Sequence, residues 1–148
     1  VFIRSMAQRS AFVDSTFPPK DFWYEPMRSA AAETFASIDV NQSDMDALMI
    51  YDNFSPTVLF SLEGFGYCNA GEGGAFIESG QLRLGGNFPT NTSGGHLSES
   101  YMQGWALQLE AVRQIRGSCG ERQVKDARHV HYMAAAPVIT SIVYGEEP

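Results

Sequence analysis

The loop 90–103 contains the residues whose types and spacing best suit chemistry. Its glycine pair, Gly94-Gly95, permits positive φ angles and a close approach of the backbone to a ligand. Ser100 and Gln103 have the spacing of a capping box, which predicts that a helix begins at Tyr101. The free N–H groups at that helix end would favour developing negative charge, so the Tyr101 phenol could meet an oxyanion there. The alternative is a loop and helix cap whose tyrosine has no chemical role.

The turn 51–54 is a second candidate site. The apolar run 47–51 predicts a short buried strand, and Ser55-Pro56 predicts the N-cap and first residue of a helix. Ligands bind at such strand-to-helix turns in open α/β sheets. The polar residues of this turn are Tyr51, Asp52 and Asn53.

Composition and charge exclude several classes of protein. The chain has 148 residues, 44% of them hydrophobic and 18% charged, which indicates one globular domain with a sizeable core. The net charge of −7 argues against nucleic-acid binding. No apolar run is long enough to span a bilayer, and no signal peptide is expected. Cys68 and Cys119 predict two free thiols, with one disulfide as the alternative.

Metal binding is not expected either. Three histidines are present, and only His129 and His131 would share a strand face. A third ligand at a suitable spacing is missing from the pattern, so we predict no metal site. The segment 71–74 reads as a flexible Gly-rich loop without the Gly-Lys-Ser/Thr of a P-loop, so a nucleotide phosphate site is not expected.

The remaining pattern predicts an α/β fold with a mixed sheet covered by helices. Strands are expected within 1–12, at 82–84, and at 129–133 and 138–144, the last two as neighbours in one sheet. A loop is expected at 14–24. Helices are expected at 26–37, from 55 to a stop at Gly64 and Gly66, and after the loop 90–103. The apolar stripe expected for this last helix is Met102, Trp105, Ala106, Leu109 and Val112.

Three segments resemble the catalytic loops in the C-terminal half of the thiolase fold. The turn 51–54 reads Tyr-Asp-Asn-Phe where the sterol-carrier and lipid-transfer branch carries His-Asp-Cys-Phe. Gly94-Gly95 leads to Tyr101, which stands at the position of the thiolase catalytic histidine. The segment 134–137 stands at the position of a Cys-x-Gly loop, yet it contains neither residue type. Segments 63–74 and 113–117 add support, and the chain is most similar to the steroid side-chain-degrading aldolases of that branch.

The resemblance implies a particular chemistry. Thiolysis is not expected, because the second catalytic cysteine and the histidine are missing. A retro-aldol lyase is implied instead, acting on a β-hydroxyacyl-CoA thioester of a steroid side chain and releasing propionyl-CoA and a 17-keto steroid. One tyrosine would relay the hydroxyl proton and the other would donate to the enolate. The catalytic candidates are Tyr51, Tyr101, Asp52 and His96, and the substrate-binding candidates are Asn53, Asn91, Gly94 and Gly95.

Two of these candidates carry open alternatives. Asp52 orients a catalytic group or acts as a base, or else it only caps the turn. His96 is near Tyr101 in the sequence, but its direction is left open, and a lone loop histidine is more often structural or exposed.

The resemblance also implies an assembly. Residues 1–148 are expected to form one thiolase-like C-terminal domain, with the N-terminal half of the fold outside this chain. An OB-fold/zinc-ribbon partner, a homodimer of the thiolase fold and a bacterial cytoplasmic setting are implied. No cofactor is expected beyond CoA as part of the substrate. The alternatives are a non-catalytic scaffold that binds acyl-CoA or lipid, and a thiolase-type acyltransferase that uses another thiol.

Overall fold

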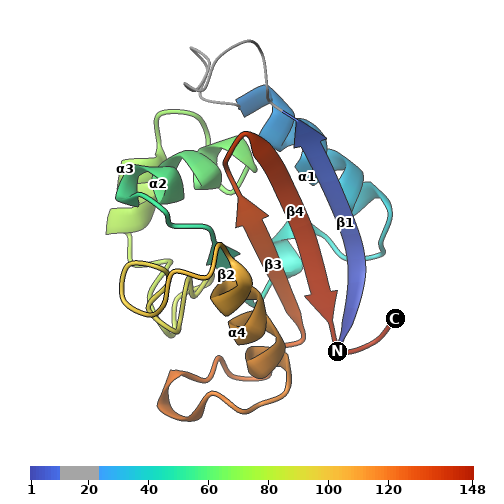
Figure 1. The fold of residues 1–148 in the computed structure, drawn as a ribbon, viewed down its shortest axis with the longest axis vertical. Helices are drawn as coiled ribbons and strands as arrows, with labels where there is room; N and C mark the ends of the chain where they lie inside the picture. The colour runs from blue at the N-terminus through green and yellow to red at the C-terminus, as the bar shows by residue number, and fades with distance from the viewer. Residues whose placement is uncertain (11–23) are drawn as a thin grey trace.

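The computed structural model describes residues 1–10 and 24–148, and within them one mixed sheet forms the centre of the domain (Figure 1). Its order is β1-β4-β3-β2, with β2 parallel to β3 and the other pairs antiparallel. The predicted α/β class with a mixed sheet is therefore confirmed. The loop expected at 14–24 lies outside the described residues except for Tyr24. The strands are β1 (Phe2–Ser10), β2 (Ala47–Ile50), β3 (His129–Ala134) and β4 (Val138–Gly145).

Helices cover both faces of this sheet and make a three-layer arrangement. Helix α1 packs against β1 and β4 on one face, while α4 packs against β2 and β3 on the other (Figure 1). Strand β2 is buried on both faces: Leu48 and Ile50 join the core with α1, and Ala47 and Met49 join the core with α4. The helices are α1 (Tyr24–Ala36), α2 (Ser55–Gly64), α3 (Gly73–Glu78) and α4 (Trp105–Ile115), with short 3₁₀ helices η1 (Gln42–Asp44) and η2 (Gly120–Arg122).

The start of α4 corrects the predicted capping box. The helix begins at Trp105, and its N-cap is Gly104 with φ +92°. Gln103 also has a positive φ, of 49°. Two successive left-handed residues cannot belong to a right-handed helix, so Tyr101 lies in the loop before it. The helix end that was expected to act on the Tyr101 phenol is therefore not there.

The predicted apolar stripe of α4 is also wrong in its main members. Trp105 is 63% exposed and Leu109 is 45% exposed. The buried face instead contains two polar residues, so a prediction from the spacing of hydrophobic residues placed it on the wrong side of the helix. Its members are Ala106, Leu107, Glu110, Ala111 and Gln114.

Three smaller differences follow from local contacts. Residues 82–84 form turns rather than a strand, with backbone bonds from Arg83 N to Gly80 O and from Gly86 N to Arg83 O. The Gly-rich segment enters α3, because the buried Glu63 carboxylate accepts the Gly73 N–H at 2.9 Å. The N-cap of α2 is Phe54 rather than Ser55.

Two further features of the described residues bear on function. None of their helices is both long and apolar enough to cross a membrane. Cys68 and Cys119 are both free, the first half-buried and the second buried.

Candidate active site

The site begins where the loop after residue 89 runs along the free edge of β2. Leu48 exchanges backbone hydrogen bonds with this loop, donating to Pro89 O and accepting from Asn91 N. The Asn91 side chain continues the ladder: Ile50 N donates to Asn91 Oδ1 at 2.7 Å, and Asn91 Nδ2 donates to Ile50 O at 2.8 Å. The amide of Asn91 thus replaces a strand residue and fixes the loop beside the end of β2.

Asp52 joins the same loop to the turn that follows β2. It is only 4% exposed, and its Oδ1 accepts the His96 N–H at 2.9 Å. Gly95 has φ +67°, and a Cβ at this position would lie 2.1 Å from Asp52 Oδ2. Only glycine fits there. The close backbone approach predicted at Gly95 is therefore an approach to the Asp52 carboxylate. Gly94, also with positive φ, is exposed and donates to Asn91 O.

His96 links this loop to the start of α4. Its Nε2 accepts the Gly104 backbone N–H at 2.8 Å, so the neutral ring must carry its proton on Nδ1. That Nδ1 is buried and has no hydrogen-bond partner among residues 1–10 and 24–148. The ring is turned toward the two tyrosines. Its centroid lies 4.8 Å from that of Tyr51 and 5.3 Å from that of Tyr101, with both pairs close to perpendicular.

The two predicted tyrosines lie together at the surface end of this cluster. Their hydroxyl oxygens are 3.2 Å apart, within hydrogen-bond distance. Tyr101 is 65% exposed and Tyr51 is half-buried. Burial, the hydrogen bond with Tyr101 and the nearby Asp52 raise the pKa of Tyr51 to about 12. Tyr51 is therefore a protonated phenol at neutral pH and can donate a hydrogen bond.

Asn53 is the predicted residue whose side chain serves the local turn. Its Oδ1 accepts from Thr57 Oγ1 at 3.1 Å, and the same hydroxyl also reaches the carbonyls of Tyr51 and Phe54. These bonds fix the entry into α2. The structure thus brings Tyr51, Asp52, His96 and Tyr101 into one cluster, with Asn53, Asn91, Gly94 and Gly95 forming its frame.

Sequence reasoning missed Gly104 and Tyr132. A Cβ at Gly104 would lie 2.2 Å from the Tyr132 hydroxyl oxygen and 3.5 Å from the ring of Tyr51. Tyr132 lies on β3 and is buried, and burial raises its pKa well above the usual range. No signal in the sequence marks Gly104, because the helix expected to begin at Tyr101 would place this glycine inside it. Tyr132 lies in an apolar strand pattern, and nothing there separates it from a core residue.

The histidines of β3 do not form a metal site. The two ring nitrogens of His131 lie 2.7 Å from the Tyr67 hydroxyl and 2.8 Å from the Ser141 hydroxyl, and burial lowers the pKa of His131 to about 3. Both nitrogens are thus used in the core. In the described part of the chain, no three residues of His, Cys, Asp and Glu are grouped to hold a metal ion.

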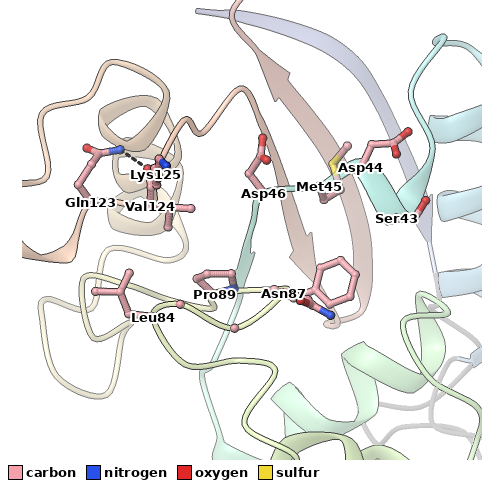
Figure 2. A pocket seen from close by; sticks show the side chains of 13 residues that line it. Ser43, Asp44, Met45, Asp46, Leu84, Asn87, Pro89, Gln123, Val124 and Lys125 are labelled. Carbon is pink, nitrogen blue, oxygen red and sulfur yellow. Dashed lines mark hydrogen bonds between the residues drawn. The ribbon is translucent and has the colours of Figure 1, made fainter.

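A cavity of about 750 Å³ lies at the opposite end of β2 (Figure 2). Its carboxylates have structural tasks. Asp46, directly before β2, accepts the backbone N–H groups of Arg128 and His129, and Asp44 accepts the N–H of Asn41. Tyr51 directly follows the strand, so this cavity and the tyrosine cluster are separated by its whole length. We therefore place the candidate active site at the tyrosines.

This mixed sheet with helices on both faces, and with the two tyrosines at the carboxyl end of β2, is a thiolase-type α/β domain. The chain belongs to the thiolase C-terminal domain-like family, whose model matches residues 13–143. It is 41% identical over 109 residues to a steroid side-chain-cleaving aldolase of Thermomonospora curvata, a match covering 74% of this chain and 28% of that protein.

Other relatives have related names. The chain is 37% identical over 109 residues to the 17-hydroxy-3-oxo-4-pregnene-20-carboxyl-CoA lyase of Mycobacterium tuberculosis, with the same coverage of 74% and 28%. It is 32% identical to rat sterol carrier protein 2, covering 79% of this chain and 23% of that protein. A solved structure, the Ltp2-ChsH2(DUF35) aldolase, aligns with a TM-score of 0.83 and 32% identity over 97% of this chain and 39% of the other. The chain spans less than a third of the length of these curated relatives.

Proposed function

We propose that this chain supplies a catalytic tyrosine pair to a carbon–carbon lyase that cleaves a β-hydroxyacyl-CoA thioester of a steroid side chain by a retro-aldol reaction. The observation that carries the proposal is the 3.2 Å contact between the Tyr51 and Tyr101 hydroxyls at the carboxyl end of β2. The names of two relatives at 41% and 37% identity support the substrate class. The products would be propionyl-CoA and a 17-keto steroid.

In the proposed reaction one proton leaves the substrate and one is returned to it, so the enzyme neither gains nor loses a proton. The β-hydroxyl loses its proton, the carbon–carbon bond breaks as that carbon becomes a ketone, and the bonding electrons form the thioester enolate. The α-carbon then takes up a proton. Two hydrogen-bonded phenols suit this sequence as a relay: the phenol that takes up the hydroxyl proton passes its own proton to the other phenol, which donates one to the α-carbon, so both phenols end protonated. The reaction uses no cofactor other than the CoA of the substrate.

Asp52 and His96 have supporting roles in this proposal. Asp52 Oδ1 already accepts the His96 N–H, and His96 Nε2 already accepts the Gly104 N–H. A base role for His96 at Nε2 would break its link to α4. We therefore propose that both residues hold the loop that presents Tyr101, and that His96 keeps one donor, Nδ1–H, beside the phenols.

A second candidate function is a scaffold that binds acyl-CoA or lipid without catalysis. Its support is a set of exposed apolar side chains within four residues of Tyr51, His96 or Tyr101 in the sequence: Phe54 at 68%, Leu97 at 60% and Trp105 at 63% exposure. Such a surface suits an apolar ligand or partner as well as it suits a substrate.

An acyltransferase that uses one of the two thiols has less support. Burial, together with Glu63 and Glu72, raises the pKa of Cys68 to about 11. Burial likewise raises the pKa of Cys119. The thiolate is the nucleophilic form, so both groups are mostly protonated and weakly nucleophilic at neutral pH.

The proposal extends to the assembly. The solved neighbour is named as an aldolase that includes a DUF35 protein, which supports a hetero-oligomer with a partner of that kind. An OB-fold/zinc-ribbon partner, a homodimer of the thiolase fold and a cytoplasmic setting belong to the same proposal.

The test is product formation by the intact protein with a DUF35 partner. A 17-hydroxy steroid side-chain CoA thioester is added without free CoA, and propionyl-CoA is followed by mass spectrometry. We expect Tyr51→Phe and Tyr101→Phe each to lower kcat by about 10²–10³. Because the two phenols act together, kcat of the double variant should fall by much less than the product of the two single losses. Tyr144→Phe is the control, since that hydroxyl bonds Gln108 away from the pair. Unchanged turnover in both tyrosine variants would refute the proposal, and tight binding without product would favour the scaffold.

A further inference from the structure

A fully buried carboxylate lies beside the loop that carries His96. Glu110 on α4 is 0% exposed, and its Oε1 accepts from the Thr92 hydroxyl at 2.9 Å. Arg122, the last residue of η2, binds both carboxylate oxygens, with Nε 2.8 Å from Oε1 and Nη2 3.1 Å from Oε2. A buried charge is costly without such pairing, so Arg122 is what permits the carboxylate here.

Gln114, one turn further along α4, completes the network. Its Nε2 donates to the Thr92 hydroxyl at 2.8 Å and to Arg122 O at 2.8 Å, while its Oε1 accepts the Val124 N–H at 2.8 Å. The Thr92 hydroxyl therefore both donates and accepts, which fixes its direction. Gln114 belongs to segment 113–117, which the proposed chemistry leaves without a role.

Burial alone would raise the pKa of Glu110, but the hydrogen bonds from Arg122 and Thr92 outweigh it and hold this pKa below its usual value. The carboxylate is therefore charged at neutral pH. Two ionic hydrogen bonds and one from Thr92 converge on it, and such charge-assisted bonds are stronger than neutral ones.

Thr92 is the middle of three anchors on this loop. The first is Asn91, one residue earlier, which pairs with the backbone of Ile50 at the end of β2. The third is His96, whose N–H binds Asp52 after β2. Asn91 and the backbone N–H of His96 join the loop to β2 and the turn after it, whereas Thr92 joins it to the middle of α4. The His96 ring, through Gly104, also joins the loop to the start of that helix. The position of Tyr101 relative to Tyr51 thus depends on anchors to both β2 and α4.

We propose that Glu110, balanced by Arg122, is a positioning residue that acts through Thr92 to hold the loop 90–104, and with it Tyr101, against Tyr51. The catalytic part of this inference rests on the proposed function. An apolar residue at position 110 would pack against the residues that face α4 without directing the hydroxyl of Thr92. A buried, paired carboxylate sets that direction.

The experiment uses the intact protein with its DUF35 partner and three variants, Thr92→Val, Glu110→Gln and Arg122→Lys. Thr92→Val keeps the shape and removes the hydroxyl, Glu110→Gln keeps an acceptor without the charge, and Arg122→Lys keeps the charge without the bidentate geometry. Arg116→Gln is the control, because that arginine is exposed and lies at the end of the same helix. The first readout is hydrogen exchange of the backbone amides in 90–104, compared with β3 and β4.

We expect faster exchange in 90–104 for Thr92→Val and Glu110→Gln, unchanged exchange in β3 and β4, and no effect of Arg116→Gln. We expect kcat to fall about 10–100-fold in Thr92→Val with KM changed less than about 3-fold, since a misplacement near 1 Å costs up to about 10²-fold. Arg122→Lys should keep most of the turnover that the other two variants lose.

Three results would overturn the inference. The first is unchanged exchange in 90–104 for both Thr92→Val and Glu110→Gln. The second is faster exchange with normal turnover, which would leave the network without a catalytic consequence. The third is an equal increase in amide exchange in 90–104 and in β3 and β4, which would mean that Glu110 stabilises the whole domain rather than this loop. If the unmodified assembly makes no product, the proposed function fails, while the exchange measurement still decides whether Glu110 holds the loop.

Discussion

Replacing Gly95 by alanine should be far more damaging than replacing a glycine of the same backbone conformation elsewhere. Gly95 has φ +67°, and Gly117, just after α4, has φ +66°. A Cβ on Gly95 would lie 2.1 Å from Asp52 Oδ2, whereas a Cβ on Gly117 meets nothing within 4 Å among the described residues. The two positions therefore share the left-handed strain and differ in the contact.

The expected magnitudes follow from these two contributions. Left-handed backbone costs an L-residue about 1–2 kcal/mol, so Gly117→Ala should lower the free energy of unfolding by that amount. Gly95→Ala carries the same cost and also displaces Asp52, which loses its bond to the His96 N–H. A hydrogen bond to a charged group is worth about 1.5–3 kcal/mol, so the total loss for Gly95→Ala should be about 2.5–5 kcal/mol.

Denaturant unfolding of the intact protein, with both variants measured side by side, checks this difference. Asp52→Ala alone and combined with Gly95→Ala completes a double-mutant cycle, in which the combined loss should fall short of the sum by about 1.5–3 kcal/mol. Equal losses for Gly95→Ala and Gly117→Ala, or strict additivity in the cycle, would refute the argument that Asp52 requires glycine at position 95.

Other predictions concern the pair and its surroundings. Because the pKa of Tyr51 is raised to about 12 from about 10, its contribution to the free energy of unfolding is complete below pH 10 and is lost between about pH 10 and 12. Denaturant titrations across this range should show a smaller decline in Tyr51→Phe. Iodoacetamide at pH 7.5 should label Cys68 slowly and leave turnover intact, as mass spectrometry and the lyase assay would show; rapid labelling with loss of activity contradicts this. Asn91→Ala should cost about 1–3 kcal/mol and speed amide exchange at Ile50, and Asn91→Asp, which keeps the acceptor but turns a carboxylate oxygen toward the Ile50 carbonyl, should not cost less.

Local patterns predicted the elements well where neighbouring residues determine them. The strands at 129–133 and 138–144 were expected as neighbours and are antiparallel partners in the sheet. The helix expected at 26–37 is α1, Tyr24–Ala36. The helical spacing of apolar residues and the runs of apolar and β-branched residues are properties of the sequence itself, so these elements could be predicted from it.

The grouping of the two tyrosines could be predicted, but not the contacts that support it. Tyr51 and Tyr101 were identified, yet the helix end expected at Tyr101 was wrong, because Gly104 with its bond to His96 Nε2 determines where α4 begins. The prediction of which face of α4 is buried was wrong, because Glu110, a charged residue, is buried through its pairing with Arg122. Both depend on side-chain contacts between residues 8 and 12 positions apart, which the spacing of apolar residues does not reveal.

The contacts of the site also bear on the order in which the chain folds. The β3–β4 hairpin joins residues that are near in sequence, whereas Asn91 bonds Ile50 across 41 residues, His96 bonds Asp52 across 44, and the two tyrosines meet across 50. Closing such long loops costs more entropy than closing a hairpin, and non-local contacts slow folding. The hairpin can therefore form early, while the tyrosine pair forms only once the loop 90–104 has docked on β2.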